Sequence, residues 1–281
     1  MRGGPLGRLL AAAWRAPGGR TGLLLLLGFG ALATLAPPFL TDPATMSDVT
    51  AGAMAPSMAH PFGTDHLSRD VLSRVINGAR ISLVIALVAV AVSLVLGAGV
   101  GMVAGYVGGA VDAILMRLVD GARAIPRLFL LLLLILVWER IPLTALILVL
   151  GFTGWLGTSR LVRGEVLRLR HAPFILAARS LGASPYRVLR VHLLPNVAGP
   201  LIVAATLGLG EVILLEAGLS FLGLGVQPPT PSWGGMILEA RPVLITAPWT
   251  SLFPGLAIAC TVLAGNLVGD ALQASLDPRT A

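Results

Sequence analysis

Long apolar runs constrain this chain more than any other feature of its sequence. A helix needs about 20 apolar residues to cross about 30 Å of hydrocarbon, and inside that layer its backbone groups must bond within the helix. The sequence therefore predicts an all-α membrane protein with six transmembrane helices. The predicted spans are Thr21–Leu40, Ile81–Tyr106, Leu115–Val137, Leu143–Thr158, Val197–Leu222 and Pro248–Val268, of which the third is interrupted by Arg117, Asp120, Arg123 and Arg127.

The composition supports lipid as the solvent of this protein. Of its 281 residues, 56% are hydrophobic and 12% are charged, whereas a soluble domain carries roughly 25% charged residues. The net charge of +7 is compatible with nucleic-acid binding. However, the arginines lie between apolar runs, as the positive-inside rule expects of a membrane protein. We therefore expect membrane lipid, and no nucleic acid, as a partner.

Two further features of the composition exclude common kinds of site. All 20 basic residues are Arg, and a P-loop needs a Lys to reach the phosphates, so the chain is not expected to hydrolyse ATP itself. Cys260 is the single cysteine, so neither a disulfide framework nor a cysteine metal site is expected. We expect no cofactor, no metal site and no catalytic residue.

The charges between the runs predict the topology. Residues 1–20 carry arginines and no acid, and the segment Arg160–Arg190 is rich in Arg with Glu165 as its single acid. Six spans place both segments on one side, which the positive-inside rule makes cytoplasmic. Both termini are then cytoplasmic, and the expected outer loops are 41–80, Trp138–Pro142 and Val226–Ala247.

The first apolar run has two interpretations. Arg15 and Arg20 precede it, as in a signal peptide, but the run is long for a signal peptide and the rest of the chain is also membrane. We favour an uncleaved first span. The expected organisation is a cytoplasmic tail (1–20), a first helix (21–40), an outer loop (41–80), and a five-helix core (81–281) with a cytoplasmic loop at 160–196.

The segment Leu169–Asn196 is too polar to span the membrane and predicts two short helices. Pro173 suits a first helical position, and Gly182 suits the left-handed residue after the helix end. Ser184 is then a good N-cap for a second helix that begins at Pro185 and that Pro195 is expected to stop. This basic, amphipathic pair could lie on anionic lipid or bind a cytoplasmic partner protein.

A family resemblance favours the partner. The order Ala177-Ala178, Gly182, Leu194-Pro195 is similar to the EAA loop of ABC importer permeases, with Leu176 at the position of the motif's Glu. In that family the loop is a coupling helix seated on an ATPase subunit. The resemblance therefore implies ATPase coupling by Ala177, Ala178, Gly182, Ala183, Ser184, Pro185, Leu194 and Pro195.

Further segments resemble the second permease subunit of dipeptide, oligopeptide and nickel importers. They are His60–Asp65 with Ser68–Arg74, Gly78–Leu83, Glu216–Gly225, Pro231–Gly234 and Leu276–Arg279. The resemblance implies the six-span type I importer permease fold in the bacterial inner membrane. It also implies a homologous second permease, two cytoplasmic ATP-binding subunits and an extracytoplasmic binding protein that holds the peptide or nickel ligand. We expect that protein to dock on Thr64, Asp65, Arg69, Asp70, Pro231, Ser232, Trp233 and Gly234.

Two acidic residues lie inside the fifth predicted span. Glu211 and Glu216 are costly in hydrocarbon and should face water or protein. Glu211, deeper by about one and a half turns, is the better candidate for the translocation pathway. Glu216 is equally compatible with the pathway and with a bond to backbone or to an outer-loop Arg.

The small residues Gly97, Gly101 and Gly105 share one face of the second span. Such a face allows two helices to pack closely. Packing within this subunit and packing against the second permease are equally compatible with it.

The main rival function is a self-contained secondary transporter driven by protons through Glu211 and Glu216, which would need no ATPase. An intramembrane protease is disfavoured by the residues around Asp270 and Ser220. Leu267 replaces the first glycine of the Gly-x-Gly-Asp signature, and Leu222 replaces the last glycine of Gly-x-Ser-x-Gly. An exporter permease would leave the acidic outer loop unexplained.

Overall fold

The computed structural model describes residues 7, 11, 13–40 and 52–276. In this part of the chain the secondary structure is helical, with one isolated antiparallel bridge between Thr64 and Asp70. The tail (1–20), the outer loop (41–80) and the Leu276–Arg279 motif lie partly outside the described residues. The long helices are α2 (Pro17–Leu35), α3 (Val71–Val107), α4 (Gly109–Arg123), α6 (Leu143–Leu169), α9 (Leu194–Phe221) and α11 (Trp249–Leu276).

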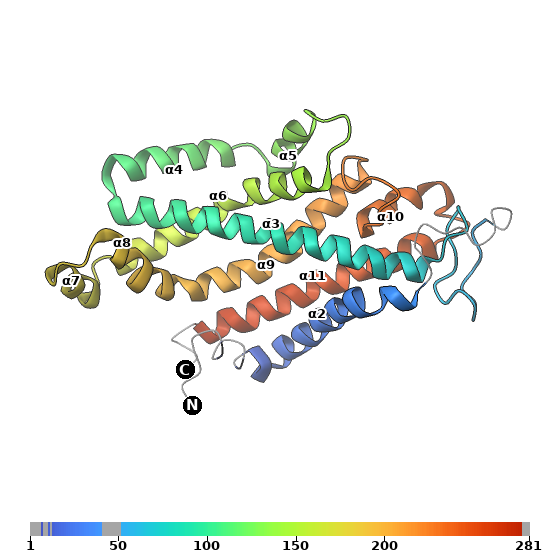
Figure 1. The fold of residues 1–281 in the computed structure, drawn as a ribbon, viewed down its shortest axis with the longest axis horizontal. Coiled ribbons are helices and arrows are strands. Elements are labelled where there is room, and N and C mark those ends of the chain that lie inside the picture. Colours follow the sequence, from blue (N-terminus) through green and yellow to red (C-terminus); the bar gives the residue numbers. More distant parts are fainter. Residues whose placement is uncertain (1–6, 8–10, 12, 41–51, 277–281) are drawn as a thin grey trace.

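Five helices of the described residues, each of 19 residues or more, are long and apolar enough to cross a membrane. The third predicted span is instead broken into α4 and the nine-residue α5 (Arg127–Ile135). Figure 1 shows α4 and α5 together leading from the inner end of α3 to the outer start of α6. The chain therefore crosses six times, and the expectation of a single helix over Leu115–Val137 was wrong. Pro126 accounts for the break, because a proline disfavours helical conformation in the residue before it.

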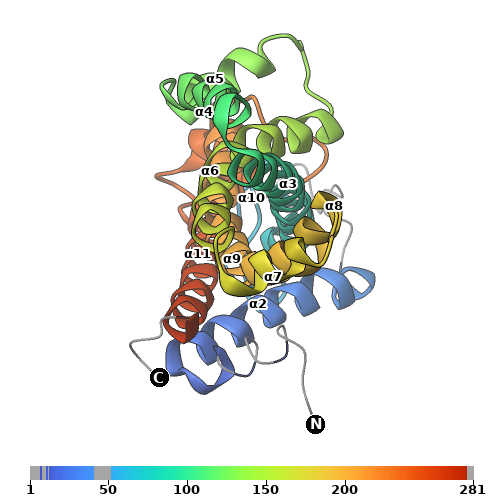
Figure 2. The same cartoon turned by 90° about the vertical axis from the view of Figure 1, so that its left-hand side faces the viewer.

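The loops gather at the two ends of the bundle. The start of α2, the end of α11 and the helices α7 (Pro173–Ser180) and α8 (Pro185–Arg187) lie at one end (Figure 1). The short helices η1 (Pro37–Phe39), α10 (Trp233–Glu239) and η3 (Arg241–Val243) lie toward the other. Figure 2 views the bundle from the first end, where α7 crosses in front of α9. The Arg-rich end is the cytoplasmic one.

The helix α3 extends beyond the hydrocarbon layer. The helix α3 has 37 residues, which at 1.5 Å per residue is about 55 Å, well over the thickness of the hydrocarbon layer. It begins at Val71, ten residues before the expected span, with Asp70 as its N-cap: the Asp70 carboxylate accepts a hydrogen bond from the backbone N–H of Ser73 at 2.7 Å. Hydropathy marks where a helix meets lipid and not where the helix begins.

The glycine face of α3 packs within this subunit, against α6. A Cβ on Gly97 would lie 2.5 Å from Cβ of Thr158, and one on Gly101 would lie 2.4 Å from the carbonyl oxygen of Ser159. A Cβ on Gly105 would lie 2.9 Å from Val166. The two backbones therefore approach as closely as small residues permit in membrane helix packing, and the choice left open by the sequence is decided.

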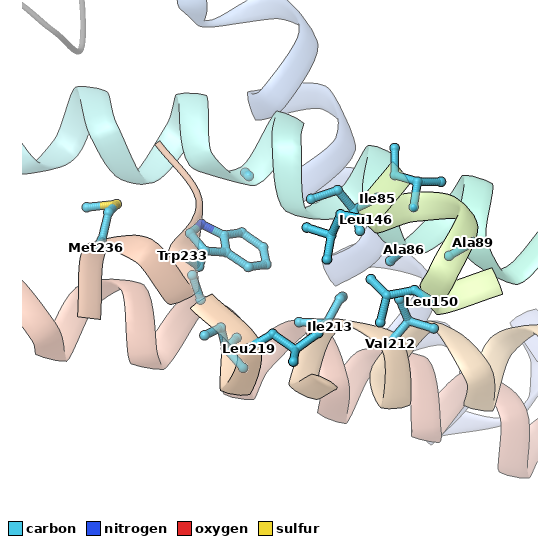
Figure 3. Packing of buried hydrophobic residues seen from close by; sticks show 14 of the residues in the cluster. Ile85, Ala86, Ala89, Leu146, Leu150, Val212, Ile213, Leu219, Trp233 and Met236 are labelled. Carbon is cyan, nitrogen blue, oxygen red and sulfur yellow. The ribbon is translucent and has the colours of Figure 1, made fainter. Parts of the chain in front are cut away.

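The core of the outer half surrounds the fully buried Trp233 of α10. Its indole N–H donates to the carbonyl of Val75 at 3.0 Å, and its ring meets Phe29 of α2 edge to face with centroids 5.9 Å apart. Figure 3 shows Trp233 beside apolar side chains of α3, α6 and α9, including Ile85, Leu146 and Ile213. Because lipid tails are as apolar as these side chains, close packing rather than hydrophobic burial stabilises the contact.

Pro195 does not end the second cytoplasmic helix, and that expectation was wrong. The chain continues from α8 through the π-helical turn η2 (Val188–Leu193) into α9. The N–H of Leu194 bonds to the carbonyl of Leu189, five residues earlier. The wider π turn changes the hydrogen-bond register before the proline, so the missing N–H of Pro195 falls in the first turn of α9, where it is tolerated.

The close α3–α6 contact gives a direct test. We expect Gly101→Val to push the helices apart and to lower the free energy of unfolding by at least the 1–3 kcal/mol or so of an overpacked core. The matched control is Gly99→Val on the same helix, where an added Cβ has no atom within 4 Å. Thermal unfolding of the purified protein in detergent measures both, and equal melting temperatures would contradict the packing described here.

Candidate functional site

The cytoplasmic elbow is formed by α7, Gly182 and α8. Gly182 has a φ of +81°, the left-handed conformation that glycine adopts without strain. Its N–H bonds to the carbonyl of Arg179, and the N–H of Ala183 bonds to that of Ala178, each at 3.0 Å, which is the Schellman arrangement of a helix C-terminus. The Ser184 hydroxyl then accepts from the N–H of Arg187 at 3.3 Å, so the expected glycine end and serine N-cap are confirmed.

The elbow is anchored on one side and displayed on the other. Ile175, Val188 and Leu193 are fully buried against Val162 and Val166 of α6. At the tip Leu181 is 88% exposed. An open hollow of about 550 Å³ borders Gly182 and is lined by Ala178, Leu181, Ala183, Ser184, Arg187 and His192. Of the residues expected to couple to an ATPase, Ala178 and Ala183 are half-buried and the following are exposed: Ala177, Gly182, Ser184, Pro185, Leu194 and Pro195.

The outer motifs form a compact layer above the bundle. Trp249 of α11 donates its indole N–H to the carbonyl of Thr64 at 3.0 Å, and Phe62 stacks on Phe253 with centroids 3.9 Å apart. Among the residues expected to receive a binding protein, Asp70 is half-buried and the following are buried: Thr64, Asp65, Arg69, Pro231, Ser232, Trp233 and Gly234. These side chains shape the outer layer from within and are not displayed on its surface.

Four charges join this layer to the bundle. Asp65 accepts from Nε of Arg69 at 2.7 Å and from Nη1 of Arg74 at 2.5 Å. Glu239 of α10 accepts from both arginines, from Nη1 of Arg74 at 2.9 Å. Burial opposes ionisation of Asp65, but the Arg69 N–H and the two guanidinium groups outweigh it and hold its pKa below the usual range. Burial also opposes ionisation of Glu239, but the hydrogen bonds and charges of Arg74 and Arg69 outweigh it, so the pKa of Glu239 is lowered as well.

Glu216 lies in the interior of the subunit, near the outer end of α9. It is 1% exposed, and its Oε1 accepts from the Ser220 hydroxyl at 2.7 Å. The α9–α10 junction is tight here, since a Cβ on Gly234 would lie 2.5 Å from Cα of Ala217. Among the described residues, Glu216 bonds neither to a backbone group nor to an arginine, the partners that its sequence position had suggested. In this conformation Glu216 does not reach the exterior of the chain.

Glu211 lies on the outside of α9 and pairs with Arg127, a residue that the sequence analysis did not single out. Nη1 of Arg127 donates to Oε1 of Glu211 at 2.5 Å, and the Glu211 side chain is 60% exposed. Arg127 appeared in the sequence only as an interruption of the third span. The proline directly before Arg127, which is the first residue of α5, is the signal in the sequence from which the break could have been predicted.

Two open hollows border the Arg127–Glu211 pair, an arrangement that fits the passage of a ligand. Within the described residues no group of three or more His, Cys, Asp or Glu side chains could hold a metal ion. Six crossings, a displayed cytoplasmic elbow and a charge pair beside open hollows define a transport permease as the class of this protein.

The comparisons with known proteins identify the family. Residues 97–281 match the model of the binding-protein-dependent transport system inner membrane component. The chain belongs to this family and is a permease subunit of an ABC importer, a multi-pass protein of the inner membrane.

The relatives include transport permeases of several bacteria. The dipeptide transport system permease protein DppC of Bacillus subtilis is 39% identical over 92% of this chain and 81% of its own length. The glutathione transport system permease protein GsiD of Pectobacterium atrosepticum is 40% identical over 80% of this chain and 74% of its own length. An inward-facing structure of the MetNI methionine ABC transporter shares the fold, with a TM-score of 0.59 and 21% identity over 73% of this chain and 97% of the other.

The outer charge network predicts a pH-dependent stability. A lowered pKa means that the stabilisation from Asp65 is present above its ordinary value of about 4 and is lost as the pH falls through the lowered value. Asp65→Asn leaves the two buried arginines with Glu239 as their shared carboxylate partner and should lower the free energy of unfolding by about 3 kcal/mol at neutral pH. The difference between the melting temperatures of the two proteins should begin to shrink below about pH 4 and should vanish only below the lowered pKa of Asp65.

The matched control is Glu165→Gln. It removes a carboxylate paired with the exposed Arg168 at 2.7 Å, and exposed pairs contribute only about 0–1 kcal/mol. Equal effects of the two substitutions would show that the outer network does not hold the layer together.

Proposed function

We propose that this chain is the second, C-type permease of an ATP-driven importer of peptides, and that it forms half of the translocation pathway. The named substrates of its relatives support peptides as the ligand class, since dipeptides and glutathione are among them. A homologous permease supplies the other half. Two cytoplasmic ATP-binding subunits and an extracytoplasmic binding protein complete the assembly, so ATP is hydrolysed by the partners and not by this chain.

The cytoplasmic elbow is the observation that carries the proposal. A leucine that is 88% exposed at a loop tip, beside a hollow and three exposed arginines (Arg179, Arg187 and Arg190), is a surface that a protein partner would cover. The elbow is buried against α6 on its other side. Movement of a bound ATPase is therefore passed to the membrane helices through packed side chains.

On the outer side we propose that the loaded binding protein docks on the layer built from 52–70 and α10. The buried motif residues act by shaping this surface. Glu211 is the better pathway residue of the two acids, since Glu216 is closed off in this conformation. Energy enters because the ATP-bound and ATP-free partners bind different conformations of the permease with different affinity.

The first test is purification of a tagged chain from its native membrane in mild detergent. We expect a second permease, P-loop ATPase chains and a binding protein to co-purify, and the reconstituted assembly to take up trialanine only with ATP. Uptake by the chain alone, driven by a proton gradient and abolished by a protonophore, would replace this proposal with the secondary transporter.

The second test uses Gly182. An added Cβ meets no atom within 4 Å, so Gly182→Val acts through the positive φ alone and should strain the elbow by about 1–2 kcal/mol. We expect ATP-dependent uptake to fall at least several-fold while the ATPases still co-purify. Gly182→Asn is the matched control, because Asn tolerates the left-handed conformation; normal uptake by Gly182→Val with bound ATPases would refute a coupling role for this residue.

A further inference from the structure

Measured from the outer ends of α9 and α6, the Arg127–Glu211 pair lies at the depth expected for the middle of the membrane. Glu211 is ten residues from the outer end of α9 at Phe221, and Gly154, which contacts Arg127, lies at a similar depth below the outer start of α6. Both are about 15 Å below those ends, half of a hydrocarbon layer of about 30 Å. Ionisable residues at this depth are costly and mark functional sites by default.

Arg127 is held in place by α6. Its Nη2 donates to the carbonyl of Leu150 at 2.9 Å, and its Nε donates to the Thr153 hydroxyl at 3.3 Å. Gly154 provides the room, because a Cβ there would lie 2.9 Å from Nη2 of the arginine. In contrast, Glu211 has one polar contact among the described residues, that with Arg127. The acid can therefore swing away while the guanidinium stays.

The pair separates two open hollows. One, of about 230 Å³, lies among α3, α6 and α9, and the other, of about 330 Å³, lies along α5 and α6. Four residues border both: Arg127, Gly154, Gly157 and Glu211. The ion pair therefore lies on the boundary that the two hollows share.

The larger of the two hollows is bordered by two arginines and one acid, Glu211, so it is suited to an anion once Glu211 has turned away from Arg127. It is bordered by Arg123, Pro126 and Arg127, so it lies at the N-terminal end of α5 in the broken third crossing. The first-turn N–H groups of a helix have no partner within it, and half-helix N-termini in broken transporter helices point at anionic groups of the substrate. A carboxylate placed here meets the helix end and Arg127 together.

We propose that Arg127 and Glu211 form a site for zwitterionic ligands in the pathway, in which Arg127 takes the carboxylate of a peptide and Glu211 takes its ammonium group. Separating the pair in a low-dielectric environment leaves two charges unpaired. A peptide with both termini free supplies a partner for both charges, whereas a peptide with one blocked terminus leaves either Arg127 or Glu211 unpaired. This inference rests on the proposed function, because it needs a peptide pathway on this face.

The test places a reporter cysteine beside the pair. Gly157 borders both hollows and an added Cβ there meets no atom within 4 Å, so Gly157→Cys, in a background with Cys260→Ser, reports on occupancy. A thiol reagent labels the assembled, nucleotide-free importer in detergent. We expect millimolar trialanine to slow labelling several-fold, and N-acetyltrialanine amide to leave the rate unchanged.

The double variant Arg127→Gln/Glu211→Gln removes both charges together, so no unpaired charge remains to prevent assembly; protection by trialanine should be lost. The matched control is Asp120→Asn/Arg160→Gln. It removes a different ion pair, which joins α4 to α6 at 2.7 Å and borders neither hollow, and this variant should keep protection.

Three results would contradict the proposed site. Trialanine does not slow labelling, the blocked peptide protects as well as trialanine, or the Arg127/Glu211 double variant is protected as well as the parent. If that variant fails to assemble, the comparison of the two peptides on the reporter protein decides alone. ATP-driven uptake by the same assembly distinguishes the proposed function from the proposed site. Uptake without protection contradicts only the Arg127–Glu211 site. Absence of uptake by the parent assembly contradicts both proposals.

Discussion

The close approach of α3 and α6 is the contact on which the rest of this structure depends. It exists because glycines at Gly97, Gly101 and Gly105 let the two backbones meet, and in lipid such packing replaces the hydrophobic effect as the source of helix association. The position of α6 then decides two functional features. Its outer half presents the Leu150 carbonyl to the guanidinium of Arg127, and its inner end presents Val166 to the buried side of the cytoplasmic elbow.

Three groups of ion pairs in the described residues lie at different depths of the bundle, and each group has its own environment. At the inner end Asp112 and Arg163 join α4 to α6 with a bond of 2.5 Å. The outer network is partly buried and binds a loop to α3 and α10. The middle pair differs from both, because it opens onto hollows on a face that no part of the described chain covers. Its exposure in a region of lipid or pathway, rather than its strength, sets it apart from pairs that serve packing alone.

Much of this arrangement could be predicted from the sequence, because the signals were local. The apolar runs located the crossings, and Gly182 and Ser184 marked the elbow correctly, since capping depends on residues a few positions apart. The rest depends on contacts between distant segments. Hydropathy does not give helix rotation, so neither the partner of Glu211 nor the burial of Trp233 was visible. Pro195 was misread because its effect depends on the hydrogen-bond register of the turn before it.

The unbroken passage from α8 through η2 into α9 has a mechanical consequence. From Pro185 to Phe221 the chain forms one helical rod of 37 residues, about 55 Å long. The elbow is at one end of this lever and α10 adjoins the other, with Glu211 in between. If the cytoplasmic end of this helix tilts, the displacement of each residue grows with its distance from that end. Glu211 and the extracytoplasmic end of the helix therefore move together.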